Sequence, residues 1–201
     1  MPALPELAFE STQPLSQPEF PAWVRKRPSW DGNRYELLNG RVVMTPPAGH
    51  PHGLIEGKLA GLLEPFIRDR QIGVYLGSSQ GFELLSGDTV AADHSFVSTE
   101  RWQAMPPPQE GEFLRVVPDL VVEILSLSTA SHDRGEKRAI YEHNGVREYW
   151  LVDSRAPEVA VFTLYGDRFD PGRVYPEGAV LRSGVLSGLE IDIQSILPRS
   201  T

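Results

Sequence analysis

Residues 118–126 read Pro118-Asp119-Leu120-Val121-Val122-Glu123-Ile124-Leu125-Ser126. They lie in the most apolar segment of the chain, 114–125, whose short and Val-rich character predicts a strand buried on both faces. Glu123 interrupts this apolar run. An ionised carboxylate inside a buried strand is costly unless it is paired or bound to a cation. The stretch therefore predicts the central strand of a sheet and a candidate functional carboxylate within it.

The segments around this strand alternate between strand and helix patterns. Asn39-Gly40 separates two short alternating runs, 35–38 and 41–44, and predicts a hairpin. Apolar residues at helical spacing predict an amphipathic helix over 52–70, with Pro65 as a candidate kink. A second helix is expected over 131–143, ended by Gly145. Further strands are expected at 73–76, 81–85, 89–97, 147–153, 159–164 and 168–175, a surface loop at 101–112 and a closing tail at 183–197. This order predicts an α/β (α+β) fold with a central mixed sheet flanked by helices.

The chain of 201 residues is expected to form one domain over 22–201, preceded by a flexible Pro-rich arm over 1–21. A hydrophobic content of 40% is too high for a fully disordered protein. The absence of cysteine excludes disulfides, thiolate metal sites and cysteine nucleophiles. The sequence shows no signal-peptide pattern and no apolar run near the ~20 residues of a membrane helix, which favours a soluble cytoplasmic protein.

The net charge of −8 is unfavourable for nonspecific binding of duplex nucleic acid. Such binding relies on Lys and Arg side chains that neutralise phosphates. An acidic nuclease is still compatible with this charge if its carboxylates hold cations and its basic groups are gathered locally.

Asp93 and Lys137 are the residues most readily combined with Glu123. Asp93 is expected inside the 89–97 strand, and neighbouring strands lie ~4.8 Å apart, so Asp93 and Glu123 can reach one divalent ion if their strands are adjacent. Mg²⁺ usually takes one or two protein carboxylates. A lysine nearby can orient water and offset charge on a phosphate. Asp119 is the rival carboxylate, but it lies roughly 13 Å from Glu123 along the strand and is interpreted as structural.

Ordinary structural roles are open for all three residues. A strand carboxylate is often the satisfied partner of an arginine or of a backbone donor. Asp133, Lys137 and Tyr141 share one helix face, so Asp133 and Lys137 can form a common helix ion pair. In that case Asp93, Glu123 and Lys137 form a buried ion-pair cluster that serves stability alone.

The order of these motifs resembles the bacterial Uma-type family of restriction-endonuclease-like proteins, within the PD-(D/E)XK nuclease superfamily. The resemblance covers roughly residues 35–197. It rests on the stretches 35–40 (YELLNG), 118–126 and 145–153 (GVREYWLVD), on Ser128-Thr129, and on single residues between them, which are His52, Asp93, Asp133, Lys137 and Tyr141.

This resemblance implies a restriction-endonuclease-like core and a Mg²⁺-dependent endonuclease (Mn²⁺ is also possible) with Asp93 and Glu123 as metal ligands. The superfamily's lysine normally follows two residues after the acidic residue, where this chain has Leu125. The family supplies the lysine from the next helix, which here is Lys137. A second departure is Ala92, where the family usually has proline before the aspartate; this position shapes the backbone and carries no chemistry.

Several residues are assigned supporting roles. Tyr141 would support Lys137 from one helical turn further on. Glu36 either faces the site as an added carboxylate or caps the hairpin through hydrogen bonds, and the structural role is favoured because carboxylates often satisfy nearby backbone donors. His52 either contacts phosphate or metal or simply begins its helix. Arg134, Arg138 and Arg147 are expected near the site, the first two as phosphate contacts.

The leading hypothesis is hydrolysis of phosphodiester bonds in nucleic acid, DNA more readily than RNA. The alternative is a weakly active or inactive nuclease-fold module for binding or assembly, which the acidic net charge favours. A homodimer is expected, since two-fold pairs are the commonest oligomers.

Overall fold

The computed structural model describes residues 9–10, 13–28 and 32–198. Its centre is a sheet in the strand order β11-β10-β9-β8-β7-β4, with β12 also paired to β10. Strands β8 and β9 are parallel, and the other neighbours are antiparallel. The sheet therefore confirms the predicted central mixed sheet. Its strands are β4 (Gly73–Gly77), β7 (His94–Ser98), β8 (Leu120–Ile124), β9 (Glu148–Asp153), β10 (Glu158–Tyr165), β11 (Arg168–Phe169) and β12 (Arg173–Pro176).

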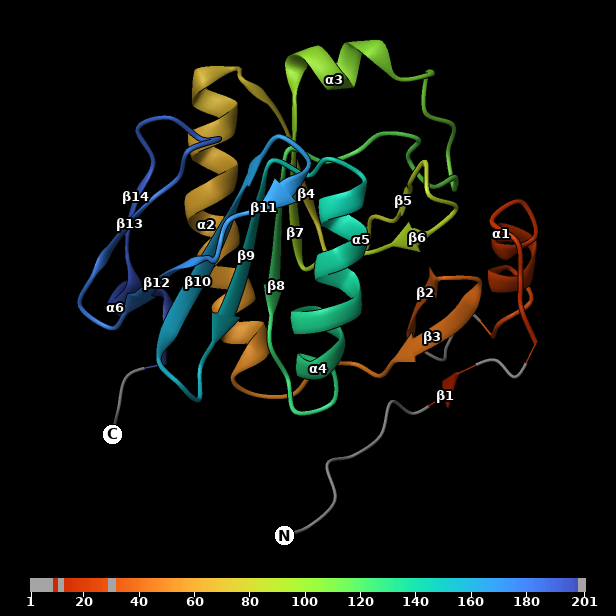
Figure 1. The fold of residues 1–201 in the computed structure, drawn as a ribbon, viewed down its shortest axis with the longest axis horizontal. Helices are drawn as coiled ribbons and strands as arrows, with labels where there is room; N and C mark the ends of the chain where they lie inside the picture. The colour runs from red at the N-terminus through yellow and green to blue at the C-terminus, as the bar shows by residue number, and fades with distance from the viewer. Residues whose placement is uncertain (1–8, 11–12, 29–31, 199–201) are drawn as a thin grey trace, which may run out of the picture.

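Helices cover both faces of this sheet (Figure 1). Helix α2 (His52–Arg70) runs unbroken through Pro65 and packs on one face, together with β13 (Val180–Arg182), β14 (Glu190–Asp192) and α6 (Ile193–Ile196). A second helical run covers the other face, where α4 (Ala130–His132) and α5 (Arg138–His143) flank a π-helical turn, Asp133–Lys137. Gly145 follows this run with a φ of 79°, as expected for a residue that ends a helix.

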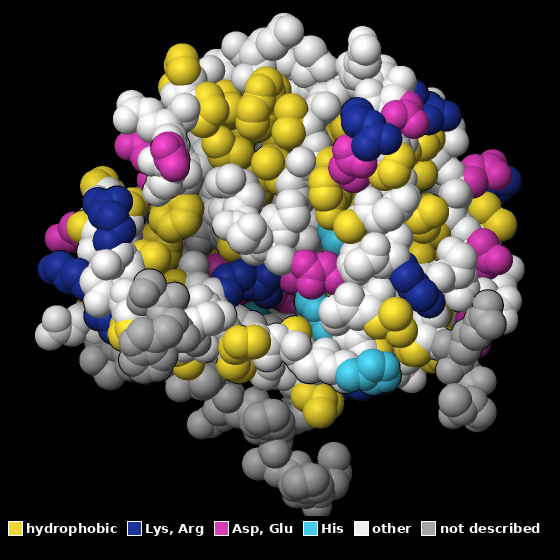
Figure 2. Space-filling model, turned by 180° about the vertical axis from the view of Figure 1, so that it is seen from behind, with side chains coloured by type: hydrophobic (Ala, Val, Ile, Leu, Met, Phe, Trp, Pro, Cys, Tyr) yellow, Lys and Arg dark blue, Asp and Glu magenta, His cyan; other side chains and the backbone are white. Residues whose placement is uncertain are grey.

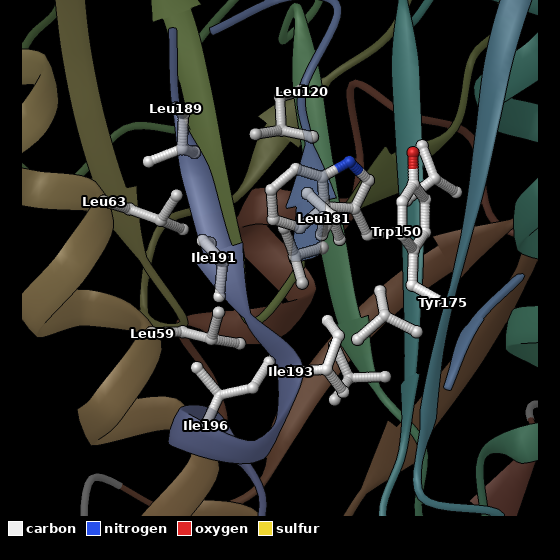
Figure 3. Packing of buried hydrophobic residues seen from close by; sticks show 14 of the residues in the cluster. Leu59, Leu63, Leu120, Trp150, Tyr175, Leu181, Leu189, Ile191, Ile193 and Ile196 are labelled. Atoms are coloured by element: carbon white, nitrogen blue, oxygen red, sulfur yellow. The ribbon is translucent and has the colours of Figure 1, made fainter. Parts of the chain in front are cut away.

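Strand β8 sends alternate side chains to the two faces. Leu120, Val122 and Ile124 join the cluster beneath α2, in which Leu59 and Leu63 face Trp150 and Leu120 across the core (Figure 3). Val121 joins the cluster beneath α5. Successive strand residues point to opposite faces, so Glu123 points toward the α4–α5 run with Val121. The predicted burial of this strand on both faces is confirmed, although it begins at Leu120 rather than at residue 114.

A second, smaller sheet lies beside the first (Figure 1). Its strand order is β1-β3-β2-β6-β5, and β2 and β3 form the predicted hairpin. Asn39 and Gly40 have φ values of 50° and 74°, the left-handed conformations that a two-residue hairpin turn requires. Its strands are β1 (Phe9–Glu10), β2 (Arg34–Leu38), β3 (Arg41–Thr45), β5 (Phe82–Glu83) and β6 (Thr89–Val90).

Two sequence expectations differ from the structure near this sheet. The strand expected over 89–97 is divided, because β6 pairs in the small sheet and β7 in the main sheet. The loop expected over 101–112 begins inside helix α3 (Thr99–Ala104), which Ser98 caps by accepting a hydrogen bond from the Arg101 N–H. A helix this short has too few residues to show a periodic pattern, and the proline run that follows it favours a loop.

The predicted flexible arm, residues 1–21, lies partly outside the described residues, which omit 1–8 and 11–12. The described remainder is packed on the small sheet. The Leu15 N–H donates to the Gly40 carbonyl, and the Gln17 amide donates to the carbonyls of Leu84 and Asp88. Helix α1 (Phe20–Val24) buries Phe20 completely. This part of the expected arm therefore belongs to the folded unit.

Within the described residues, helices that combine the length and the apolarity needed to cross a membrane are absent.

Candidate active site at the junction of the two sheets

Asp93 lies where the chain passes from the small sheet to the main sheet. It occupies a bend between β6 and β7, one residue before β7, rather than the strand interior expected from sequence. His94 pairs with Val122 across β7 and β8, so extending that register by one residue places Asp93 opposite Glu123. The Ile124 N–H donates to Asp93 Oδ2 at 2.7 Å, which fixes the carboxylate against the end of β8.

Glu123 is the centre of a buried hydrogen-bonded group. Its Oε1 lies 2.6 Å from Lys137 Nζ and accepts a hydrogen bond of 2.9 Å from the Tyr141 hydroxyl. Glu123, Lys137 and Tyr141 each expose 2% or less of their surface. The predicted meeting of Glu123 with the Lys137–Tyr141 helix face is therefore present in the fold.

Lys137 is the last residue of a π-helical turn. The turn spans Asp133–Lys137, and both of its end residues are buried. The Tyr149 hydroxyl donates to the Asp133 carbonyl at 3.0 Å, so a buried backbone acceptor at the start of the turn is satisfied. Such single π-turns inside helices occur frequently at functional sites. The Asp133 carboxylate lies 3.8 Å from Lys137 Nζ, so the helix ion pair considered from sequence exists beside the pair with Glu123.

Glu36 reaches the same lysine from the small sheet. Its Oε1 lies 2.9 Å from Lys137 Nζ and accepts a hydrogen bond of 2.8 Å from the Ala91 N–H. One Glu36 oxygen thus satisfies a backbone donor outside the hairpin and also pairs with the lysine. Glu36 thereby connects β2 to the chain segment that carries Asp93.

His52 and Arg34 hold Asp93 from the opposite side. His52, the first residue of α2, places Nε2 3.1 Å from Asp93 Oδ2, and Arg34 Nη1 lies 2.9 Å from Asp93 Oδ1. Arg34 was not among the site residues predicted from the sequence. Its spacing could have indicated it, because Arg34 and Glu36 are two residues apart on one strand and so share a face.

Charge is unbalanced in this buried group. Four carboxylates (Glu36, Asp93, Glu123 and Asp133) face two permanent cations, Lys137 and Arg34. Burial, aided by the neighbouring Asp133 and Asp93, raises the pKa of Glu123 to about 8 against the opposing effect of Lys137. Burial likewise raises the pKa of Asp133 to about 6. Loss of solvation on burial is the main cause of both raised pKa values, and the neighbouring carboxylates add to it.

The pKa shifts of Asp93 and Lys137 favour the charged form of each side chain, in contrast to those of Glu123 and Asp133. Burial alone would raise the pKa of Asp93, but the His52 hydrogen bond and the Arg34 charge lower it well below its usual range. Burial alone would lower the pKa of Lys137, but Glu123, Glu36 and Asp133 raise it above its usual range. Lys137 is therefore an ammonium ion at any physiological pH.

The donor set fits a hard divalent cation with few protein ligands. Groups of three or more His, Asp or Glu side chains arranged to hold a metal do not occur in the part of the chain that is described. Mg²⁺ needs only one or two carboxylates and retains water otherwise. Asp93 and Glu123 supply two, and the excess negative charge would favour a cation there.

The remaining predicted residues lie away from Asp93 and Glu123. Arg134 pairs with Asp153 at 2.7 Å, and Arg138 lies over the Phe162 ring at 4.3 Å, so both contact the β9–β10 side of the sheet. Arg147 was expected near the site, but it pairs with Asp119 at the opposite end of β8. Asp119 also accepts a hydrogen bond from the Ser98 N–H at 2.7 Å, which agrees with its structural interpretation.

A cleft of about 520 Å³ leads from the surface to Asp93. Figure 2 shows basic, acidic and histidine side chains gathered around a hollow on the face seen there. Arg34, His52 and Asp93 line the cleft, whereas Glu123 and Lys137 lie behind them in the interior. A ligand that enters the cleft therefore meets Arg34, His52 and Asp93 first.

Comparison with known proteins agrees with this architecture. A family model named Uma2, described as "Putative restriction endonuclease", matches residues 18–194. The uncharacterized protein slr1290 of Synechocystis is 24% identical over 151 residues, which cover 74% of this chain and 73% of that protein. A crystal structure of a putative nuclease from Anabaena variabilis has a TM-score of 0.74 at 18% identity, and the match covers 91% of this chain and 97% of that one. The restriction-endonuclease-like fold expected from the sequence is thus confirmed, and the chain belongs to the Uma2 family.

Proposed function

We propose that this protein is a divalent-metal-dependent nuclease that hydrolyses phosphodiester bonds in DNA. The observation that carries the proposal is the placement of Asp93 opposite Glu123 at the ends of adjacent strands, with Lys137 Nζ 2.6 Å from Glu123. Membership of the Uma2 family supports the reaction class. The metal, the DNA substrate, the cytoplasmic location and the homodimer remain predictions.

In this proposal Asp93 and Glu123 hold the cation, Mg²⁺ or Mn²⁺. When bound, the ion supplies Lewis-acid polarisation of the phosphate and activation of water. Glu123 must be ionised to act as a ligand; burial disfavours that form and raises the pKa of Glu123, whereas the Lys137 charge and the Tyr141 hydrogen bond act in the opposite direction.

Lys137 acts as a fixed positive charge. Its raised pKa keeps it protonated, so it offsets the negative charge that develops on phosphate and orients water by donating hydrogen bonds, but it does not remove a proton. Glu36 and Asp133 hold its ammonium group in position.

The test is cleavage of plasmid and of labelled oligonucleotides with Mg²⁺ or Mn²⁺. Glu123→Gln retains an oxygen for the Tyr141 hydroxyl but removes the charge, so we expect a loss of at least about 100-fold, typical for loss of a key electrostatic group. Glu190→Gln is the matched control, because Glu190 is exposed and pairs with Arg182 on the far β13–β14 hairpin. Equal cleavage by wild type and Glu123→Gln would exclude this assignment.

A binding or assembly module is the second candidate, because the chain's own cations already pair with the presumed metal ligands. Arg34 and His52 contact Asp93, and Lys137 contacts Glu123. Calorimetric titration with Mn²⁺ separates the two functions. Absence of binding at millimolar Mn²⁺, together with absence of cleavage, would favour the module.

A further inference from the structure

The cleft that reaches Asp93 has cationic and aromatic residues in its lining. Arg34 and His52 line it together with Asp93, and so do Tyr35 and Phe113. Its volume of about 520 Å³ falls within the range of pockets that enclose one small organic ligand, roughly 300–1,000 Å³.

Arg34 and His52 both have unused hydrogen-bonding capacity, since Arg34 Nε and His52 Nδ1 are buried without a hydrogen-bond partner among the described residues. Arg34 Nη1 bonds to Asp93. Buried polar atoms are normally satisfied, so an unsatisfied one indicates a missing partner such as a water or an ion. The Arg34 side chain is 22% exposed, and its planar donor group suits phosphate oxygens.

Neighbouring aromatic rings and backbone hold Phe113 and Tyr35 in place. Phe113 stacks on Phe20 with ring centroids 5.7 Å apart, and its ring lies so close to the Gly81 backbone that a Cβ there would be 2.5 Å from it. Tyr35 packs edge-on against Trp23 at 5.3 Å. Aromatic side chains held in place this way can stack with nucleic-acid bases of any sequence.

Size and charge together disfavour a paired duplex. The reacting phosphate must reach Asp93, which is 1% exposed in the lining of the cleft. The cleft volume of about 520 Å³ suits one small organic unit such as a nucleotide rather than a paired duplex. A net charge of −8 also offers little of the extended phosphate neutralisation that a duplex requires.

We propose that the cleft binds one unpaired nucleotide, with its phosphate on Arg34 and its base against Phe113. The preferred substrate is then single-stranded or locally unpaired nucleic acid. This inference rests on the proposed nuclease function for its relevance to cleavage, but the binding it describes is measured without catalysis.

The experiment measures fluorescence anisotropy of a labelled oligothymidylate, a paired hairpin and a strand of abasic residues, in EDTA and again in Ca²⁺. We expect the oligothymidylate to bind at least about tenfold more tightly than the hairpin. One or two phosphate contacts predict a slope of log affinity against log salt of about −0.7 to −1.4 for the single strand.

Variants at Arg34 and Phe113 test the phosphate contact and the base contact separately. Arg34→Met should weaken oligothymidylate and the abasic strand alike, by about tenfold, and Arg34→Lys should restore part of the affinity. Phe113→Leu, which retains an apolar side chain, should weaken oligothymidylate by about fivefold or more and leave the abasic strand unchanged. Tyr165→Ala is the control, because Tyr165 is 70% exposed on β10 outside the cleft.

The outcomes also separate this inference from the proposed function. Tight single-strand binding with the expected variant effects but no cleavage in Mg²⁺ or Mn²⁺ supports the cleft assignment and contradicts the nuclease. Cleavage of duplex and single strand at equal rates, or binding unaffected by both Arg34→Met and Phe113→Leu, overturns the cleft assignment. Absence of measurable oligothymidylate binding under both conditions also overturns it.

Discussion

Lys137 is the residue on which the buried site depends, because its ammonium group contacts Glu36, Glu123 and Asp133 together. The sequence indicated Glu123 through its buried strand and Lys137 through the face it shares with Asp133 and Tyr141. It could not show that Glu36 also reaches the lysine, because that contact spans 101 residues of sequence and joins the two sheets.

Removal of Lys137 should destabilise the protein strongly. Lys137→Met leaves three buried carboxylates without their shared cation, and breaking a buried pair in this way costs about 3–5 kcal/mol. Urea unfolding in EDTA measures the loss, since EDTA removes any contribution from bound metal.

The double variant Lys137→Met/Glu123→Gln is the internal control. Removal of one charge from the cluster should recover part of the lost stability, because fewer carboxylates then remain uncompensated. A double variant as unstable as the sum of the two single variants would show that Lys137 and Glu123 are not energetically coupled.

At the scale of elements, the accuracy of the sequence prediction follows from how local each signal is. Helix α2 begins and ends where its apolar period predicts, at His52 and Arg70, and the hairpin turns at Asn39-Gly40. The apolar period of the helix and the Asn-Gly turn can both be recognised from residues that lie close together in the sequence. The division of the 89–97 segment between two sheets was missed, because it depends on partners far along the chain, β2 for Thr89 and β8 for His94.

The π-turn Asp133–Lys137 likewise leaves no clear pattern in sequence, but Gly135 within it permits a test. A Cβ at Gly135 would meet no atom within 4 Å, so Gly135→Ala should stabilise the helical run by about 0.4–1 kcal/mol. Cleavage should be unchanged, since Lys137 keeps its place. Unfolding in urea measures the gain.

Gly73→Ala is the contrasting substitution. A Cβ at Gly73 would lie 2.1 Å from the Val97 carbonyl oxygen, where β4 meets β7, and Gly73 has a φ of 156°. Gly73→Ala should therefore destabilise the protein.

For the π-turn, the opposite result would be informative. A loss of stability with Gly135→Ala would mean that the π-turn requires the backbone freedom of glycine.

At the scale of the whole molecule, the site exists because two sheets meet. Asp93 comes from the residue just before β7 and Glu123 from the end of β8, two interior strands of the main sheet, and Arg34 and Glu36 come from β2 of the small sheet. The small sheet rests on a separate apolar cluster of Phe20, Leu37 and Val42, so the stability of that cluster should determine how firmly Arg34 and Glu36 are held.

Phe20→Ala tests this dependence. Phe20 is fully buried, and its truncation should cost about 3–5 kcal/mol. If the small sheet loosens before the main sheet unfolds, hydrogen exchange should accelerate first at the amides of β2 and β3, while those of β8 and β9 stay protected. Single-strand binding should weaken in parallel, since Arg34 belongs to β2.

Leu85→Ala provides the matched control, because Leu85 precedes β6 but is 95% exposed and should contribute almost nothing to stability. Uniform acceleration of exchange across both sheets in Phe20→Ala would show that they unfold as one cooperative unit. Arg34 and Glu36 would then be held by the fold as a whole, and local loosening could not regulate access to Asp93.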